Sequence, residues 1–126
     1  MTSWFGVIAA LYGALGVSMG AFGSHGLRDK VEPRMLEVWT TATQYQLWHA
    51  LALLLVAFWI SKEAQVSTAM QVAAWSFAVG ILIFSGSLYV LVLSGIHWLG
   101  AVTPIGGTAL IIGWIALAYA LLPKSL

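Results

Sequence analysis

Residues 70–94 of the chain are MQVAAWSFAVGILIFSGSLYVLVLS, an unbroken stretch that contains no Asp, Glu, Lys or Arg. A helix needs about 20 apolar residues to cross the hydrocarbon core of a bilayer. This stretch is therefore long and apolar enough to predict a transmembrane helix. It decides the fold class, because three other parts of the chain have the same character.

The other three apolar stretches are residues 4–24, 42–60 and 99–122, and they too lack charged side chains. Of the 126 residues 61% are hydrophobic and 7% are charged, whereas a soluble domain carries about 25% charged residues. The sequence predicts an all-α membrane protein, a four-transmembrane-helix bundle that forms one domain over residues 1–126. The charged residues lie between the stretches or in the tail: Arg28, Asp29, Lys30, Glu32, Arg34, Glu37, Lys62, Glu63 and Lys124.

Composition also excludes several classes of function. A net charge of +1 gives no basic patch for nucleic acid. The absence of cysteine excludes disulfides, thiolate metal sites and thiol nucleophiles. No charged residue precedes Trp4, so we expect the first stretch to be a retained helix rather than a cleaved signal peptide. The basic residues are split almost evenly between the two sides, so they favour neither orientation.

Prolines and glycines suggest where the helices begin and turn. Pro33 suits a first helical turn, and neither proline nor glycine follows before Ile60, so the second helix is expected to start near Pro33. Gly95 lies in a very short connection that predicts a tight hairpin between the third and fourth helices. Pro104 favours a helix start, whereas a helix that began at His97 would be kinked there.

Small residues recur on single helix faces, where they allow two helix backbones to approach closely in a bilayer. We predict that these glycines pack helices together, against neighbours in the same chain or in another copy. The predicted packing positions are Gly13, Gly16, Gly20, Gly106 and Gly113. Aromatic residues are expected at the two membrane interfaces, with Trp4, Trp59, Trp75 and Tyr119 at one and Trp39 and Trp98 at the other.

Polar side chains gather on one arc of residues 42–60. At about 100° per residue, Tyr45, Gln46 and His49 share this arc, and the opposite arc of Leu47, Leu51, Leu54 and Phe58 should face lipid. Polar groups inside a membrane usually face the bundle interior or a water-filled cavity. The arc predicts either a ligand site or proton relay, completed by His25, or a set of hydrogen bonds between helices.

The third stretch adds Ser85 and Tyr89, which share a helix face and are expected to bond to residues 42–60. A serine nucleophile would need a base and an orienting acid, but no carboxylate lies at that depth, so we expect no enzyme. His25 and His49 could converge as haem ligands, with His97 on the same side as His25. No third zinc ligand is evident, and we expect neither a metal nor another cofactor.

Several segments together resemble a known family. They are Gly20-Ala21-Phe22-Gly23-Ser24-His25-Gly26, Gln44-Tyr45-Gln46 with His49, Phe84-Ser85-Gly86-Ser87-Leu88-Tyr89, and Thr103-Pro104-Ile105-Gly106-Gly107 with Gly113-Trp114. In this order the chain resembles the YgdD/YwdK-like family of small bacterial membrane proteins, a domain of unknown function with relatives in animals. Ser24 stands where that family more often has alanine.

The resemblance covers essentially the whole chain and implies four transmembrane helices in a bacterial plasma (inner) membrane. It implies no activity, substrate or cofactor. The positions that its pattern marks are His25, Gln46, His49, Ser85, Ser87, Tyr89, Thr103 and Pro104.

Two functions follow as expectations. The first is a non-enzymatic protein of the lipid bilayer that packs with itself or with a partner membrane protein and holds a lipid-like or quinone-like ligand near His49. The alternative is a transporter or channel for protons or a small solute, which would act as an oligomer because four short helices enclose little room.

Overall fold

Four long helices make up the fold in a computed structural model, which describes residues 3–123. They are α1 (Phe5–Phe22), α2 (Pro33–Lys62), α3 (Thr68–Ser94) and α4 (Thr103–Ala120). Counted with the short turns that adjoin α1 and α4, all four are long and apolar enough to cross a membrane. The predicted all-α fold with four membrane-spanning helices is confirmed. Lys124, which the sequence places in the charged tail, lies outside the described residues.

The helix ends agree with the sequence in part. The second helix does begin at Pro33, and the α3–α4 connection turns at Gly95, whose φ of 73° is a left-handed conformation that glycine adopts without strain. A 3-10 helix, His97–Ala101, precedes α4, and Pro104 lies in the first turn of α4. Because the first amides of a helix have no internal acceptor, Pro104 begins α4 and does not kink it.

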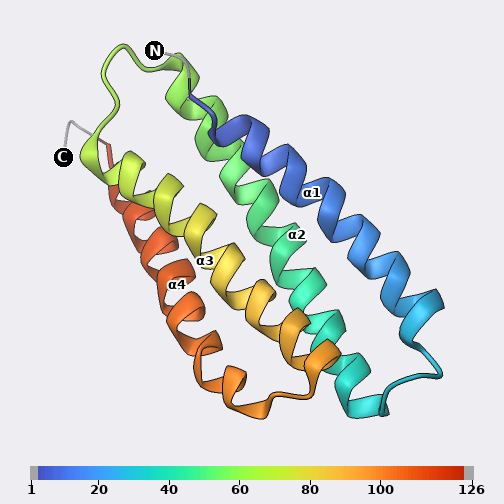
Figure 1. The fold of residues 1–126 in the computed structure, drawn as a ribbon. Coiled ribbons are helices and arrows are strands. Elements are labelled where there is room, and N and C mark those ends of the chain that lie inside the picture. The colour runs from blue at the N-terminus through green and yellow to red at the C-terminus, as the bar shows by residue number, and fades with distance from the viewer. Residues whose placement is uncertain (1–2, 124–126) are drawn as a thin grey trace.

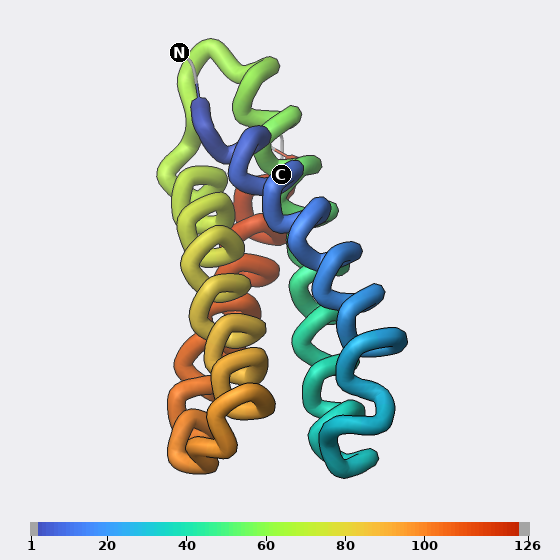
Figure 2. The backbone as a smooth tube through the Cα atoms, turned by 45° about the vertical axis from the view of Figure 1, so that its right-hand side comes forward, coloured from blue at the N-terminus to red at the C-terminus, as the bar shows by residue number. Residues whose placement is uncertain are grey.

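The helices pack mainly against their neighbours in chain order: α1 on α2, α2 on α3 and α3 on α4. Figure 1 shows them side by side in this order, and Figure 2 shows the α1–α2 pair beside the α3–α4 pair. The beginning of α1, the α2–α3 loop and the end of α4 lie at one end of the molecule (Figure 1). This end is called the loop end below.

The core lies between α2 and α3, where both helices are most buried. Its main cluster includes Leu53, Val56, Ala73, Phe77 and Ile81, and a smaller cluster around Trp39 and Ala42 lies toward the other end. Apolar contact with lipid costs nothing, so this core stabilises the fold through close packing rather than through removal of water.

Trp39 corrects the prediction of an interfacial aromatic belt. Its side chain is only 1% exposed, and its Nε1 donates a hydrogen bond to the Met19 carbonyl at 2.7 Å. Gly23 makes room for the ring, since a Cβ there would lie 2.6 Å from the Trp39 Cδ1. Trp39 therefore joins α1 to α2. The other predicted belt residues, Trp4, Trp59, Trp75, Trp98 and Tyr119, are exposed.

Three of the five predicted packing glycines do admit a neighbouring helix. A Cβ on Gly16 would lie 2.7 Å from Leu47 Cδ2, one on Gly106 2.8 Å from the Phe84 Cα, and one on Gly113 2.8 Å from Phe77 Cδ1.

Gly13 and Gly20 differ, because a Cβ at either position would meet nothing within 4 Å. Within the described residues neither glycine packs against another helix, and packing against another copy of the chain stays a prediction. Leu47 was expected to face lipid, but it packs against Gly16, whereas Leu51 and Phe58 are exposed as predicted.

Candidate functional site

Gln46 connects three helices through its side-chain amide. Its Nε2 donates to the Tyr12 carbonyl of α1 at 2.8 Å, and its Oε1 accepts from the Tyr89 hydroxyl of α3 at 2.6 Å. The Tyr12 hydroxyl in turn donates to the Ala78 carbonyl of α3 at 2.7 Å. Each polar group of Gln46 is thus matched by a partner on a different helix.

Two serines of α3 extend these contacts to both neighbouring helices. Ser85 is buried and donates to the Ala42 carbonyl of α2 at 2.7 Å. The expected bonds from Ser85 and Tyr89 to residues 42–60 are therefore present. On the other side of α3, the hydroxyls of Ser87 and Thr103 lie 2.6 Å apart and join α3 to the beginning of α4.

His49 uses both ring nitrogens in contacts within the chain. Its Nδ1 lies 2.7 Å from the Tyr45 carbonyl, and the Trp114 Nε1 of α4 donates to its Nε2 at 2.9 Å. A carbonyl can only accept and an indole N–H can only donate. The pair of contacts therefore selects the neutral imidazole with its proton on Nδ1.

Aromatic rings surround His49 and Tyr45. Tyr45 stacks on Phe84 with centroids 4.5 Å apart and lies nearly parallel to the His49 ring at 5.8 Å. Phe77 and Trp114 meet at 5.1 Å with one ring edge against the other ring face, and both contact His49. Such pairs stabilise beyond the area that they bury.

Two residues of the candidate site, Tyr12 and Trp114, were not selected from the sequence. Trp114 appeared only as part of the Gly113-Trp114 motif, although an indole N–H one residue from a packing glycine is well placed to reach a neighbouring helix. We call these residues the interhelical polar network: Tyr12, Gln46, His49, Ser85, Tyr89 and Trp114.

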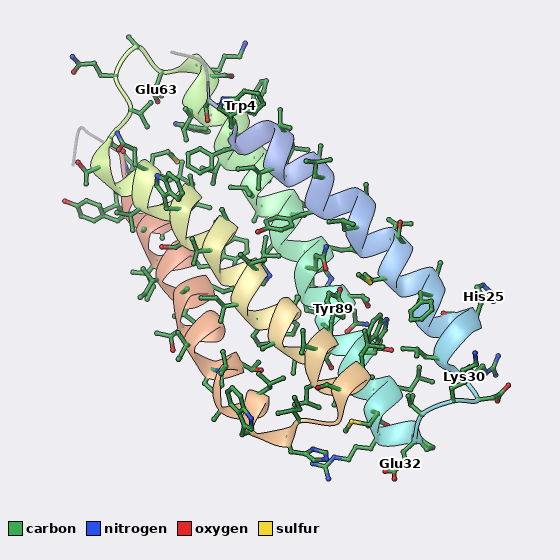
Figure 3. All side chains as sticks on the ribbon, viewed as in Figure 1. Trp4, His25, Lys30, Glu32, Glu63 and Tyr89 are labelled. Atoms are coloured by element: carbon green, nitrogen blue, oxygen red, sulfur yellow. The ribbon has the colours of Figure 1, made fainter. Side chains whose placement is uncertain are left out.

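His25 does not belong to the network. It lies exposed in a π-helical turn, Gly23–Leu27, that continues α1, and Figure 3 shows it at the end of the molecule near Lys30 and Glu32, away from Tyr89. His97 is also exposed. The histidines do not converge, and within residues 3–123 no three His, Cys, Asp or Glu side chains gather as a metal site would require.

Hydrogen bonds within the chain engage the polar side chains of the network. In the part of the chain that the structure describes, no buried side-chain nitrogen or oxygen lacks a hydrogen bond. Tyr45, Gln46, His49, Ser85 and Tyr89 are thus brought together, as the sequence predicted. The side-chain polar atoms of all but Tyr45 serve contacts between helices or within one helix. This arrangement can hold helices in register.

Comparison with known proteins places the chain among bacterial membrane proteins. Residues 19–107 match the family model described as "Protein of unknown function (DUF423)". The chain is 44% identical to the UPF0382 membrane protein YwdK of Bacillus subtilis over 92% of this chain and 94% of the relative. It is 47% identical to a UPF0382 membrane protein of Staphylococcus aureus over 92% and 93% of the two chains. No solved structure matches it.

Proposed function

Because the chain belongs to the DUF423 family of membrane proteins of unknown function, we propose that it is a non-enzymatic membrane protein that acts through association with other proteins in the bilayer. The observation that carries the proposal is the interhelical polar network. Every buried polar side-chain atom of the described residues is already hydrogen-bonded, so the polar residues have a complete structural use. We infer that the bilayer is the bacterial plasma membrane, as the resemblance implies.

The open face of α1 supports association as the mode of action. Gly13 and Gly20 are two turns apart on α1, and among residues 3–123 no atom beyond the adjacent backbone of α1 would lie within 4 Å of a Cβ at either position. Small residues on a membrane helix allow another helix to approach closely, which strengthens packing and weak hydrogen bonds between backbones. A second copy of the chain or a helix of a partner membrane protein would fit this face.

The sequence also led us to expect a ligand at His49. This part of the proposal has less support from the structure than association with other proteins. Both ring nitrogens are engaged by Tyr45 and Trp114. A quinone or lipid headgroup would have to displace at least one of these contacts before it could bond to His49.

Cross-linking in native membranes tests the proposal, since the natural chain has no cysteine. A Gly13→Cys or Gly20→Cys variant is labelled with a photoactivatable maleimide and irradiated. We expect a discrete protein adduct, either a dimer or a conjugate of defined mass. Leu51→Cys is the control, because Leu51 is an exposed side chain on α2 that has no glycine beside it.

Two results would overturn the proposal. One is a pattern in which all three variants give only lipid adducts or the same diffuse protein background. The other is flux of protons or a small solute through vesicles reconstituted with the pure protein, because that result would favour the transporter alternative.

A further inference from the structure

A cavity of about 680 Å³ lies at the loop end, apart from the interhelical polar network. It is formed by the beginning of α1, the end of α2, the α2–α3 loop and the first turns of α3. Its volume is within the range of about 300–1,000 Å³ that small-molecule sites occupy. Trp4 and Glu63, both of which line it, are close together in Figure 3.

The wall of the cavity is apolar and aromatic on the α1 and α3 side. Phe5 and Ile8 of α1 lie there with Trp75 of α3, and the Phe5 and Trp75 rings meet edge to face with centroids 5.2 Å apart. Trp4 and Trp75 remain 72% and 61% exposed. Tryptophan at such positions lies at the level of the lipid headgroups, so the apolar wall continues toward the acyl chains.

The polar side of the cavity carries one charged residue. Glu63 is the only ionisable side chain among the described residues that line it. Its Oε1 accepts a hydrogen bond from the Trp59 Nε1 at 2.9 Å, which fixes the carboxylate at the rim. The neighbouring Lys62 does not line the cavity, and its Nζ lies 5.1 Å from the centroid of the Phe58 ring. The rim is therefore acidic.

Neutral hydrogen-bonding groups lie beside the carboxylate. Ser3 and Gln65 both line the cavity, and a hydroxyl and a primary amide can each donate to a phosphate oxygen. The cavity thus offers a carboxylate for a cation, neutral donors for a phosphate ester, and an aromatic wall for a hydrocarbon chain. A single molecule that carries all three groups is a phospholipid with an ammonium headgroup.

We propose that the loop-end cavity binds one aminophospholipid, with its ammonium on the Glu63 carboxylate and an acyl chain against Phe5, Ile8 and Trp75. An anionic phospholipid such as phosphatidylglycerol meets the same apolar wall but places its negative charge beside Glu63. The site therefore distinguishes lipids by headgroup charge. This inference does not depend on the proposed association through α1, because its residues are separate from Gly13 and Gly20.

Native mass spectrometry of the full-length protein in detergent tests this inference. The protein is mixed with equal amounts of phosphatidylethanolamine and phosphatidylglycerol whose acyl chains give distinct masses. We expect one bound lipid per chain and a preference of about threefold for phosphatidylethanolamine, the size expected of an exposed ammonium–carboxylate pair. Glu63→Gln keeps the shape and the Trp59 contact but removes the charge, so it should bind the two lipids equally.

Two further variants complete the experiment. Glu37→Gln makes the same change at an exposed residue near the start of α2, at the opposite end, and should keep the preference. Ala64→Trp, in the exposed loop that lines the cavity, should fill it and reduce retention of both lipids. Equal binding of the two lipids by the natural chain, or an unchanged preference in Glu63→Gln, would show that the inference is wrong.

Discussion

His49 is fixed in one protonation and tautomeric state by its two partners. Nδ1 must carry the proton to meet the Tyr45 carbonyl, and Nε2 must be free of one to accept from Trp114. A second proton on the ring would place one N–H against another and break the bond to α4. The contact therefore holds α2 and α4 together only while His49 is neutral.

The His49–Trp114 bond predicts a measurable coupling energy. We expect His49→Leu and Trp114→Phe each to lower the free energy of unfolding, and the two effects to be non-additive by about 0.6 kcal/mol, up to ~1.7 kcal/mol, as for other hydrogen bonds in membranes. Unfolding in mixed micelles measures all four species of the cycle. Trp75→Phe is the control for Trp114→Phe, because Trp75 has no bond to His49, and strict additivity of the first pair would contradict the prediction.

Gly106 and Gly13 should respond differently to replacement by alanine. Gly106→Ala places a methyl group against the Phe84 backbone, and overpacking of this kind costs about 1–3 kcal/mol. Gly13→Ala meets open space and, because alanine favours a helix over glycine, should raise the free energy of unfolding of the isolated protein by at most about 1 kcal/mol. Unfolding in mixed micelles distinguishes them, and equal effects would show that the close α3–α4 approach is wrong.

At the scale of the helices, α1 is the least buried, and Gln46 is one of the residues that join it to the rest of the chain. Of the residues of α1 only Ala9 and Gly16 are buried in the chain, whereas Gln46 bonds this helix directly to α2 and, through Tyr89, to α3. The amide thus connects the least buried helix to the most buried pair.

Replacing Gln46 should therefore loosen α1. We expect Gln46→Leu to cost about 1–3 kcal/mol, because the buried Tyr89 hydroxyl loses its acceptor. Hydrogen exchange of the α1 amides should rise more than exchange in α3 or α4. Gln44→Leu is the matched control, since Gln44 is exposed on the same helix. A rise of equal size in both variants would contradict the role of Gln46.

The positions of the four helices could be predicted from sequence because the cost of placing a charged side chain in the hydrocarbon core decides them. Charged side chains are excluded from the hydrocarbon core, so the clear separation of charged and apolar segments locates each span. Pro33 and Gly95 added two helix boundaries through local backbone chemistry, which depends on the residue itself and not on distant neighbours.

The sequence could not predict in the same way which helix each helix face packs against. Helical spacing correctly gathered Tyr45, Gln46 and His49 on one arc, but it carries no information on which helix that arc meets. Tyr12 and Trp114 were therefore missed, and His25 was included in the site although it lies at the end of α1. Gly13 and Gly16 look alike in sequence, and only the one-sided position of α1 separates them.

At the scale of the whole molecule, the helices form a row, whereas in a closed four-helix bundle the first and fourth helices often lie side by side. This arrangement predicts a pattern of disulfides in a chain that naturally has none. A Cβ on Gly6 would lie 3.8 Å from the Ala57 Cβ, the mean separation in disulfides. We expect Gly6→Cys with Ala57→Cys to form an intramolecular disulfide on mild oxidation.

The control for this disulfide pairs α1 with α4 at the same end of the molecule. Gly6→Cys with Tyr119→Cys should stay reduced within one chain, since Tyr119 is exposed on α4 and α1 packs mainly against α2. Mobility on non-reducing gels after oxidation compares the two variants. Equal formation of both disulfides would indicate a closed bundle rather than a row.

The row of helices also bears on how the chain is made. Most packing joins helices that are consecutive along the chain, so each helix after the first finds a packing partner in the helix that was synthesised just before it. A nascent chain that ends after α2 already contains the complete α1–α2 contact. Assembly can then proceed in the direction of translation, and no helix has to wait in lipid for a partner that is synthesised much later.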